Sequence, residues 1–216
     1  CDAGSLTTAR TAATTAVAVD ALATPEANRL AVIGSGAVAQ AHVHYAKQLR
    51  PWQSIRLYSP GLAGKTGAQL LKLQQLDPRI QLCASQADAI RDADVVMLCT
   101  SSAKPLLDPV ELDKPALITS ISTNAPRAHE VTPASLLNMD VYCDYRATTP
   151  DSAGEMLLAS RLGWSSADIL GDLAELVSGK AVRPDYRRSV FFRSIGLGLE
   201  DVALAHALYQ LKQEAC

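Results

Sequence analysis

Two hydrophobic patterns alternate along the chain. Short, mostly apolar runs indicate strands, and they are separated by longer stretches in which apolar positions recur three and four residues apart, as in helices. We expect strands at 29–33, 54–59, 80–85, 94–100, 116–122, 140–145 and 189–194, and helices at 6–23, 36–49, 65–76, 85–93 and 196–214. The part between Pro150 and the last strand is expected to be mostly helical. Because strands that alternate with helices favour a parallel sheet covered on both faces, the pattern predicts an α/β fold. Its sheet is expected to be doubly wound and mostly parallel, with flanking N- and C-terminal helices.

Composition and charge narrow the class of protein. The chain has 216 residues, of which 48% are hydrophobic and 5% aromatic, as suits an Ala/Leu/Val core between helices and a sheet. The net charge of -2 gives no reason to expect a nucleic acid or an anionic membrane as partner. No apolar run is long enough to span a bilayer and no signal peptide is visible, so we expect a cytoplasmic protein.

The cysteines and histidines show no spacing typical of metal ligands, and we expect no metal site. Cys83, Cys99 and Cys143 lie in apolar, strand-like runs, where a free thiol behaves as a small hydrophobe. Cys1 and Cys216 are the terminal residues, and the sequence leaves open whether they are engineered or paired. Because the chain does not begin with Met, we expect it to be a piece of a longer protein.

A glycine turn joins the first strand to the helix that follows it. Residues 34–39 read GSGAVA, which fits the pattern GxGxxA. The first glycine allows a tight turn, the second lets a pyrophosphate approach the backbone, and the small Ala39 lets the helix pack on the strand. The turn follows a strand and opens a helix, so it predicts a Rossmann-type dinucleotide site. We expect contacts to the cofactor from Gly34, Ser35, Gly36, Ala37 and Val38.

The end of the second strand bears on the choice of cofactor. Dinucleotide folds that select NAD place an acidic residue there for the ribose 2′-hydroxyl, but no Asp or Glu occurs between Glu26 and Asp77. Ser59 can donate a hydrogen bond to a 2′-phosphate, and Lys65 and Arg56 are the nearby cations. We therefore expect NADPH to be preferred, with NADH as the alternative. The P-loop-like segment 59–66 lacks its first glycine, which argues against an NTPase.

Five segments in order resemble one protein family. They are LTTARTAATTAVA (6–18), VIGSGAVAQAH (32–42), SISTNAPRAHEV (120–131), VYCDY (141–145) and FFRSIGLGLEDVALA (191–205). Together they resemble the ornithine cyclodeaminase/mu-crystallin family over nearly the whole chain. That family includes ketimine reductases, which act on cyclic imines such as Δ1-pyrroline-2-carboxylate. Its members begin with a region that is absent here, and this region grips the substrate and supplies much of a dimer contact.

The resemblance implies a division of the chain. Residues 1–28 would form an N-terminal helix packing on the cofactor domain, and residues 29–190 the dinucleotide-binding Rossmann domain. Residues 191–216 would form a C-terminal helix that returns toward the absent substrate domain. The full-length protein would be a homodimer, and this part alone is expected to bind cofactor better than it catalyses.

One position favours the reductase branch of the family. Cyclodeaminases carry a GDxPGKxE-like stretch with a catalytic aspartate, and residues 122–130 match it with Asn124 at the place of that aspartate. Since an amide cannot act as a general base, the substitution favours direct reduction of an imine. We predict the cofactor-binding portion of an NAD(P)H-dependent reductase of Δ1-pyrroline-2-carboxylate or Δ1-piperideine-2-carboxylate, giving proline or pipecolate. The alternatives are an ornithine cyclodeaminase and a non-catalytic dinucleotide-binding module.

The resemblance and the predicted sheet together suggest site residues. Arg10 is expected to pair with the substrate carboxylate and Thr11 to donate to the cofactor. Ligands bind at the carboxyl ends of parallel strands, so the ends of two strands are expected to line the nicotinamide pocket with Thr100, Ser101, Ser102, Ser120, Ser122 and Asn124. Asp144 is expected to be structural or to orient a water. Glu200 and Asp201 are expected only to favour the dipole of the last helix.

Overall fold

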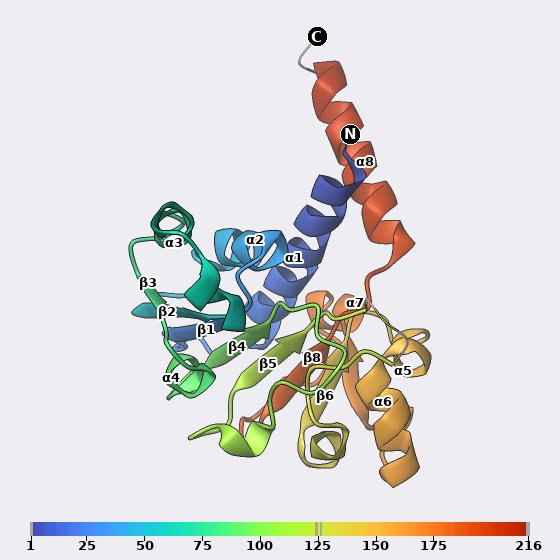
Figure 1. The fold of residues 1–216 in the computed structure, drawn as a ribbon. Helices are drawn as coiled ribbons and strands as arrows, with labels where there is room; N and C mark the ends of the chain where they lie inside the picture. The colour runs from blue at the N-terminus through green and yellow to red at the C-terminus, as the bar shows by residue number, and fades with distance from the viewer. Residues whose placement is uncertain (1, 124, 126, 215–216) are drawn as a thin grey trace.

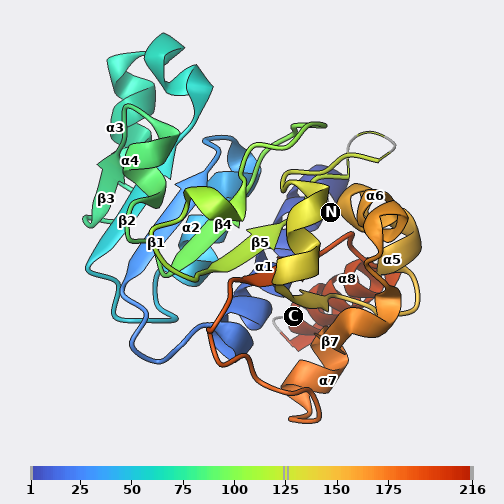
Figure 2. The same cartoon turned by 90° about the horizontal axis from the view of Figure 1, so that it is seen from below.

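The computed structural model describes residues 2–123, 125 and 127–214, and within these ranges eight parallel strands form one sheet. The strands lie in the order β3-β2-β1-β4-β5-β8-β6-β7. Figure 2 labels β3, β2, β1, β4 and β5 along one side of the sheet and β7 near the other. They are β1 (Arg29–Ile33), β2 (Ser54–Tyr58), β3 (Ile80–Leu82), β4 (Val95–Leu98), β5 (Leu117–Ser120), β6 (Asp140–Cys143), β7 (Ile169–Asp172) and β8 (Val190–Arg193). The α/β class and the parallel sheet predicted from the pattern are confirmed.

Helices connect the strands and cover both faces of the sheet (Figure 1). The α-helices are α1 (Ala3–Leu22), α2 (Ala37–Ala46), α3 (Gly67–Gln74), α4 (Gln86–Ile90), α5 (Thr149–Ser152), α6 (Gly154–Ala159), α7 (Leu173–Val177) and α8 (Gly198–Glu214). Short 3-10 turns add η1 (Pro60–Gly64), η2 (Pro109–Glu111), η3 (Pro133–Asn138), η4 (Ser160–Leu162) and η5 (Ser166–Asp168). Ser85 caps α4, because its side chain accepts from the Asp88 amide.

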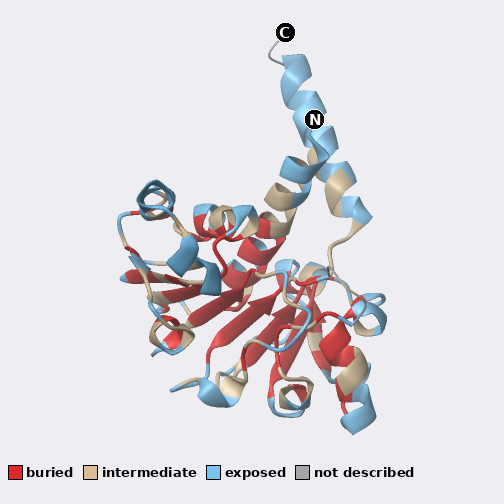
Figure 3. Ribbon diagram, viewed as in Figure 1, coloured by how far each residue is buried: buried red, intermediate tan, exposed pale blue. Residues whose placement is uncertain are grey.

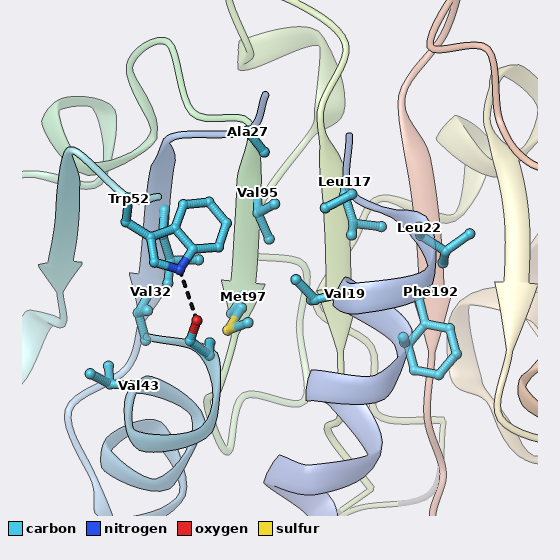
Figure 4. Packing of buried hydrophobic residues seen from close by; sticks show 14 of the residues in the cluster. Val19, Leu22, Ala27, Val32, Val43, Trp52, Val95, Met97, Leu117 and Phe192 are labelled. Atoms are coloured by element: carbon cyan, nitrogen blue, oxygen red, sulfur yellow. Dashed lines mark hydrogen bonds between the residues drawn. The ribbon is translucent and has the colours of Figure 1, made fainter. Parts of the chain in front are cut away.

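The sheet separates two apolar cores, because successive strand residues point to opposite faces. On one face, Val19 of α1 and Val43 of α2 pack with Val32 and Met97 of the strands. In the same core the Trp52 indole nitrogen donates to the Ala46 carbonyl at 2.8 Å (Figure 4). The opposite core joins the other strand positions to α4, η3 and α6. Burial on both faces explains the continuous apolar runs from which the strands were predicted.

Two features of the sheet differ from the sequence expectation. The strand β7 lies in the part expected to be mostly helical. It is an edge strand, and a Cβ at Gly171 would come 2.5 Å from the Ala181 Cβ, so this glycine lets the chain fold back closely. The strand β8 is the last in the sequence but lies between β5 and β6. The domain boundary expected at residue 190 therefore falls inside a central strand.

Most of α8 lies outside the globular body. It extends beside the start of α1, and both segments are largely exposed (Figure 3).

Among the cysteines, Cys99 and Cys143 are buried and free, as expected, whereas Cys83 is only partly buried. Cys1 and Cys216 lie outside the described residues. No helix in the described part of the chain is long and apolar enough to cross a membrane.

Candidate functional site

The glycine turn has the geometry that its sequence predicts. Gly34 follows β1 with φ +134°, and a Cβ there would lie 2.4 Å from the Cys99 carbonyl oxygen at the end of β4. Ala39 is fully buried where α2 meets the strands. Gly36 is the N-cap of α2, and a Cβ added to it would meet nothing within 4 Å. The turn thus presents bare backbone and a helix N-terminus to open space, which fits a pyrophosphate group.

The open space is the larger of two neighbouring pockets at the carboxyl edge of the sheet. It has a volume of about 610 Å³ and lies above β1, β2, β4 and β5. The strand order reverses between β1 and β4, and this is where parallel sheets bind ligands. The pocket brings together many of the residues predicted to bind the cofactor, namely Gly34, Ser35, Gly36, Ala37, Val38, Ser59, Thr100, Ser101 and Ser102.

A second pocket adjoins the first. Its volume is about 230 Å³, and it is lined by the predicted residues Arg10, Thr11 and Ser122. The two pockets share a wall formed by Val38, Thr100, Ser101 and Ile121. A dinucleotide in the first pocket would therefore meet a small substrate in the second one.

Among the described residues, two that were predicted for the site, Ser120 and Lys65, line neither pocket. Ser120 is fully buried, and its hydroxyl donates to Glu130 at 2.9 Å. Lys65 follows η1 and is not among the residues that line the pockets. Arg56, the other cation expected near the end of the second strand, donates at 2.7 Å to the Arg91 carbonyl. Asn124 lies outside the described residues.

Arg10 lies between the second pocket and the last helix. Its Nε donates to Asp201 at 2.8 Å and its Nη1 to Glu200 at 3.2 Å. The guanidinium is pressed against the backbone of Gly196, where a Cβ would collide with Nη1. The expectation that Glu200 and Asp201 serve only the helix dipole was therefore incomplete, because both acids hold Arg10 beside the pocket.

Two buried carboxylates hold the loops that line the pockets. Glu130, at the end of the family-like stretch, accepts hydrogen bonds from residues after β4 and β5, and its burial was not foreseen. Asp144, at the end of β6, accepts from the Ile195 amide at 2.7 Å and from the Gly196 amide at 2.8 Å. The structural alternative for Asp144 agrees with these bonds.

The titratable groups near the turn are held neutral. Burial lowers the pKa of His42 to about 4, although its Nδ1 donates to the Val38 carbonyl at 2.8 Å. Burial and the nearby Glu130 raise the pKa of the Cys99 thiol, so Cys99 is a weakly reactive part of the wall. Within the described residues, no group of histidine, cysteine or acidic side chains could hold a metal ion.

With this geometry established, known proteins identify the family. The sequence profile of the ornithine cyclodeaminase/mu-crystallin family matches residues 1–215. The chain belongs to this family. The resemblance drawn from the five segments is confirmed.

Three relatives show the range within the family. The chain is 64% identical to the NAD(P)H-dependent anabolic L-arginine dehydrogenase DauB of Pseudomonas aeruginosa, over 99% of this chain and 67% of that protein. It is 27% identical to the ketimine reductase mu-crystallin of Macropus fuliginosus, over 96% of this chain and 63% of that protein. The crystal structure of a probable ornithine cyclodeaminase from Bordetella pertussis superposes with a TM-score of 0.86, at 30% identity, covering 97% of this chain and 67% of that one. The chain thus spans about two thirds of the length of these relatives.

Proposed function

We propose that the chain is the cofactor-binding part of an NAD(P)H-dependent dehydrogenase that reduces the imine of an α-imino acid to the amino acid. The observation that carries the proposal is the shared wall between the glycine-turn pocket and the pocket beside Arg10. The similarity to an NAD(P)H-dependent arginine dehydrogenase supports it. The homodimer expected for the full-length protein is part of the same proposal.

The turn residues would hold the dinucleotide through backbone groups. The amides that open α2 would face the pyrophosphate, and Gly36 would leave room for it. When bound, the nicotinamide would supply the hydride. Ser59 lines the pocket and would donate to a 2′-phosphate, so NADPH remains the preferred cofactor in the proposal. In this proposal the preference for NADPH over NADH rests on Ser59, which lines the pocket, rather than on Lys65, which does not.

Arg10 would bind the carboxylate of the substrate. Its bonds to Asp201 and Glu200 use Nε and Nη1, and these acids fix the direction of the guanidinium. A planar guanidinium holds a carboxylate in a defined orientation, which would place the imine carbon against the shared wall. The pairing with two acids also limits the positive charge that the substrate meets.

Two substrate classes have support. The relative at 64% identity favours an open-chain imine, such as the one derived from L-arginine. The ketimine reductase at 27% identity favours the cyclic imines Δ1-pyrroline-2-carboxylate and Δ1-piperideine-2-carboxylate. The probable cyclodeaminase keeps ornithine cyclisation as an alternative activity. A non-catalytic dinucleotide-binding module is the remaining alternative.

Calorimetric titration of this chain with NADPH and then with NADH tests the proposal. Binding of NADPH several-fold tighter than NADH is expected, while failure of both to bind would refute the cofactor site. The full-length protein is then given NADPH with the α-keto acid of arginine plus ammonia, or with Δ1-pyrroline-2-carboxylate, and oxidation of the cofactor is followed. Ammonia release from ornithine in place of reduction would select the cyclodeaminase.

A further inference from the structure

We infer that Glu130 is a positioning residue whose buried carboxylate fixes the wall shared by the two pockets. The inference rests on the proposed function and deepens it. Glu130 is 0% exposed and is not among the residues that line either pocket. Any effect that it has on a ligand must therefore pass through the residues that it holds.

One carboxylate oxygen holds the end of β4. Oε1 accepts from the Thr100 amide at 3.1 Å and from the Thr100 hydroxyl at 2.6 Å. The same hydroxyl accepts from the Ser102 amide at 3.1 Å. Glu130 thereby orients the short loop after β4, whose residues line the cofactor pocket.

The other oxygen holds the end of β5. Oε2 accepts from the Ser120 hydroxyl at 2.9 Å and from the amides of Ile121 and Ser122, each at 3.2 Å. Thr100 and Ile121 belong to the shared wall, so the single carboxylate ties together the two strand ends that form it. Hydrogen bonds to a buried charged group are stronger than those between neutral groups.

Glu130 itself is held in place by its backbone. Its carbonyl accepts from the amides of Leu106 at 2.8 Å and Leu107 at 3.1 Å, and Leu107 forms a parallel bridge with Val131. The carboxylate is therefore presented to both loops from a fixed segment. We call this arrangement a clamp, because one carboxylate holds both loops, which are also joined by the Ser122 hydroxyl donating to the Ser102 carbonyl at 2.6 Å.

The variant E130Q removes half of this clamp with little change in volume. The amide keeps one acceptor oxygen, while its NH2 group faces donors that need an acceptor. With the oxygen toward Ile121 and Ser122, the Thr100 amide loses its partner, and the opposite orientation leaves two backbone amides unpaired. Either orientation loosens one side of the shared wall.

The matched control is D94N. Asp94 likewise accepts from two backbone amides, those of Asn28 at 2.8 Å and Arg29 at 2.9 Å, but it lies at the amino end of the strands, away from both pockets. Thermal unfolding and calorimetric NADPH titration are measured for the chain and both variants. We expect E130Q to weaken NADPH binding about tenfold, and D94N to lower the melting temperature while changing the dissociation constant less than about twofold.

A second variant keeps the test decisive if E130Q does not fold. S120A removes one donor to Oε2 from a fully buried position that touches neither pocket, and it is expected to weaken NADPH binding about threefold. Unchanged affinity in S120A and in any folded E130Q would overturn the inference. Equal loss of affinity in D94N would also overturn it, because the effect would then be general destabilisation. If the unaltered chain does not bind NADPH, it is the proposed function that fails.

Discussion

Replacement by alanine is expected to have different consequences at the two glycines of the turn: loss of stability at Gly34 and loss of cofactor affinity at Gly36. Gly34 has φ +134°, and a Cβ there would lie 2.4 Å from the Cys99 carbonyl oxygen. The variant G34A thus incurs backbone strain of about 1–3 kcal/mol and an overpacking cost of about 1–3 kcal/mol, because β1 and β4 must move apart. The sum is about 2–6 kcal/mol, a large share of the 5–15 kcal/mol that is roughly typical of a folded domain.

The variant G36A is the matched comparison. Gly36 has φ -79°, and its added Cβ meets nothing within 4 Å, so the fold should lose no more than about 1 kcal/mol from the weaker N-cap. The same methyl group enters the space proposed for the pyrophosphate. We expect it to weaken NADPH binding about tenfold or more, since the second glycine permits the close approach.

Denaturant unfolding and calorimetry separate the two effects. G34A should lower the unfolding midpoint strongly, while G36A should keep the midpoint and lose the cofactor. The reasoning is refuted if G34A unfolds like the unaltered chain, since the close approach of Gly34 to Cys99 would then not be a real constraint. It is equally refuted if G36A binds NADPH as well as the unaltered chain does.

Three further predictions follow from individual contacts. In the full-length protein, R10A should raise the substrate KM about tenfold or more and leave the NADPH dissociation constant unchanged. A loss of NADPH affinity with an unchanged KM would contradict the role of Arg10 in substrate binding. S59D should weaken NADPH more than NADH, as measured by paired titrations, because a carboxylate repels the 2′-phosphate; equal effects would contradict the role of Ser59. The pKa of His42 is lowered from 6.5 to about 4 in the folded chain, so the unfolded chain binds more protons between these values. Stability should therefore fall by up to about 3 kcal/mol as pH drops from 6.5 to 4, and denaturant unfolding of H42Q should show a smaller fall; an equal fall would exclude His42 as the cause.

The local features of the site could be predicted because their causes are local. The glycine turn requires particular residue types at fixed spacing, and the buried strands require continuous apolar runs. β7 escaped prediction because an edge strand of four residues, Ile169–Asp172, carries one glycine and one acid and has no long apolar run. Its position follows from the packing of Gly171 against Ala181, which no local pattern encodes.

Contacts between distant segments could not be predicted. Arg10 and its acids are about 190 residues apart, and only the fold brings α1 beside α8. Ser120 was expected at the pocket because it ends a strand, but it is the last residue of β5 itself and points to Glu130. Lys65 follows η1, which comes directly after Ser59, and its contact with a 2′-phosphate stays a prediction.

The buried carboxylates of Glu130 and Asp144 indicate what this part of the chain would contribute to the proposed reaction. Glu130 accepts five hydrogen bonds from Thr100, Ser120, Ile121 and Ser122, and Asp144 is similarly held by the loop after β8. Because the oxygens of both carboxylates are occupied by donors from the loops, both groups are suited to hold these loops in place. A protonated imine needs no proton at nitrogen when hydride arrives, because its positive charge is neutralised in that step. The fixed walls around Thr100 and the paired Arg10 would then contribute mainly by orientation, which is the role that the proposed reaction requires of this part of the chain.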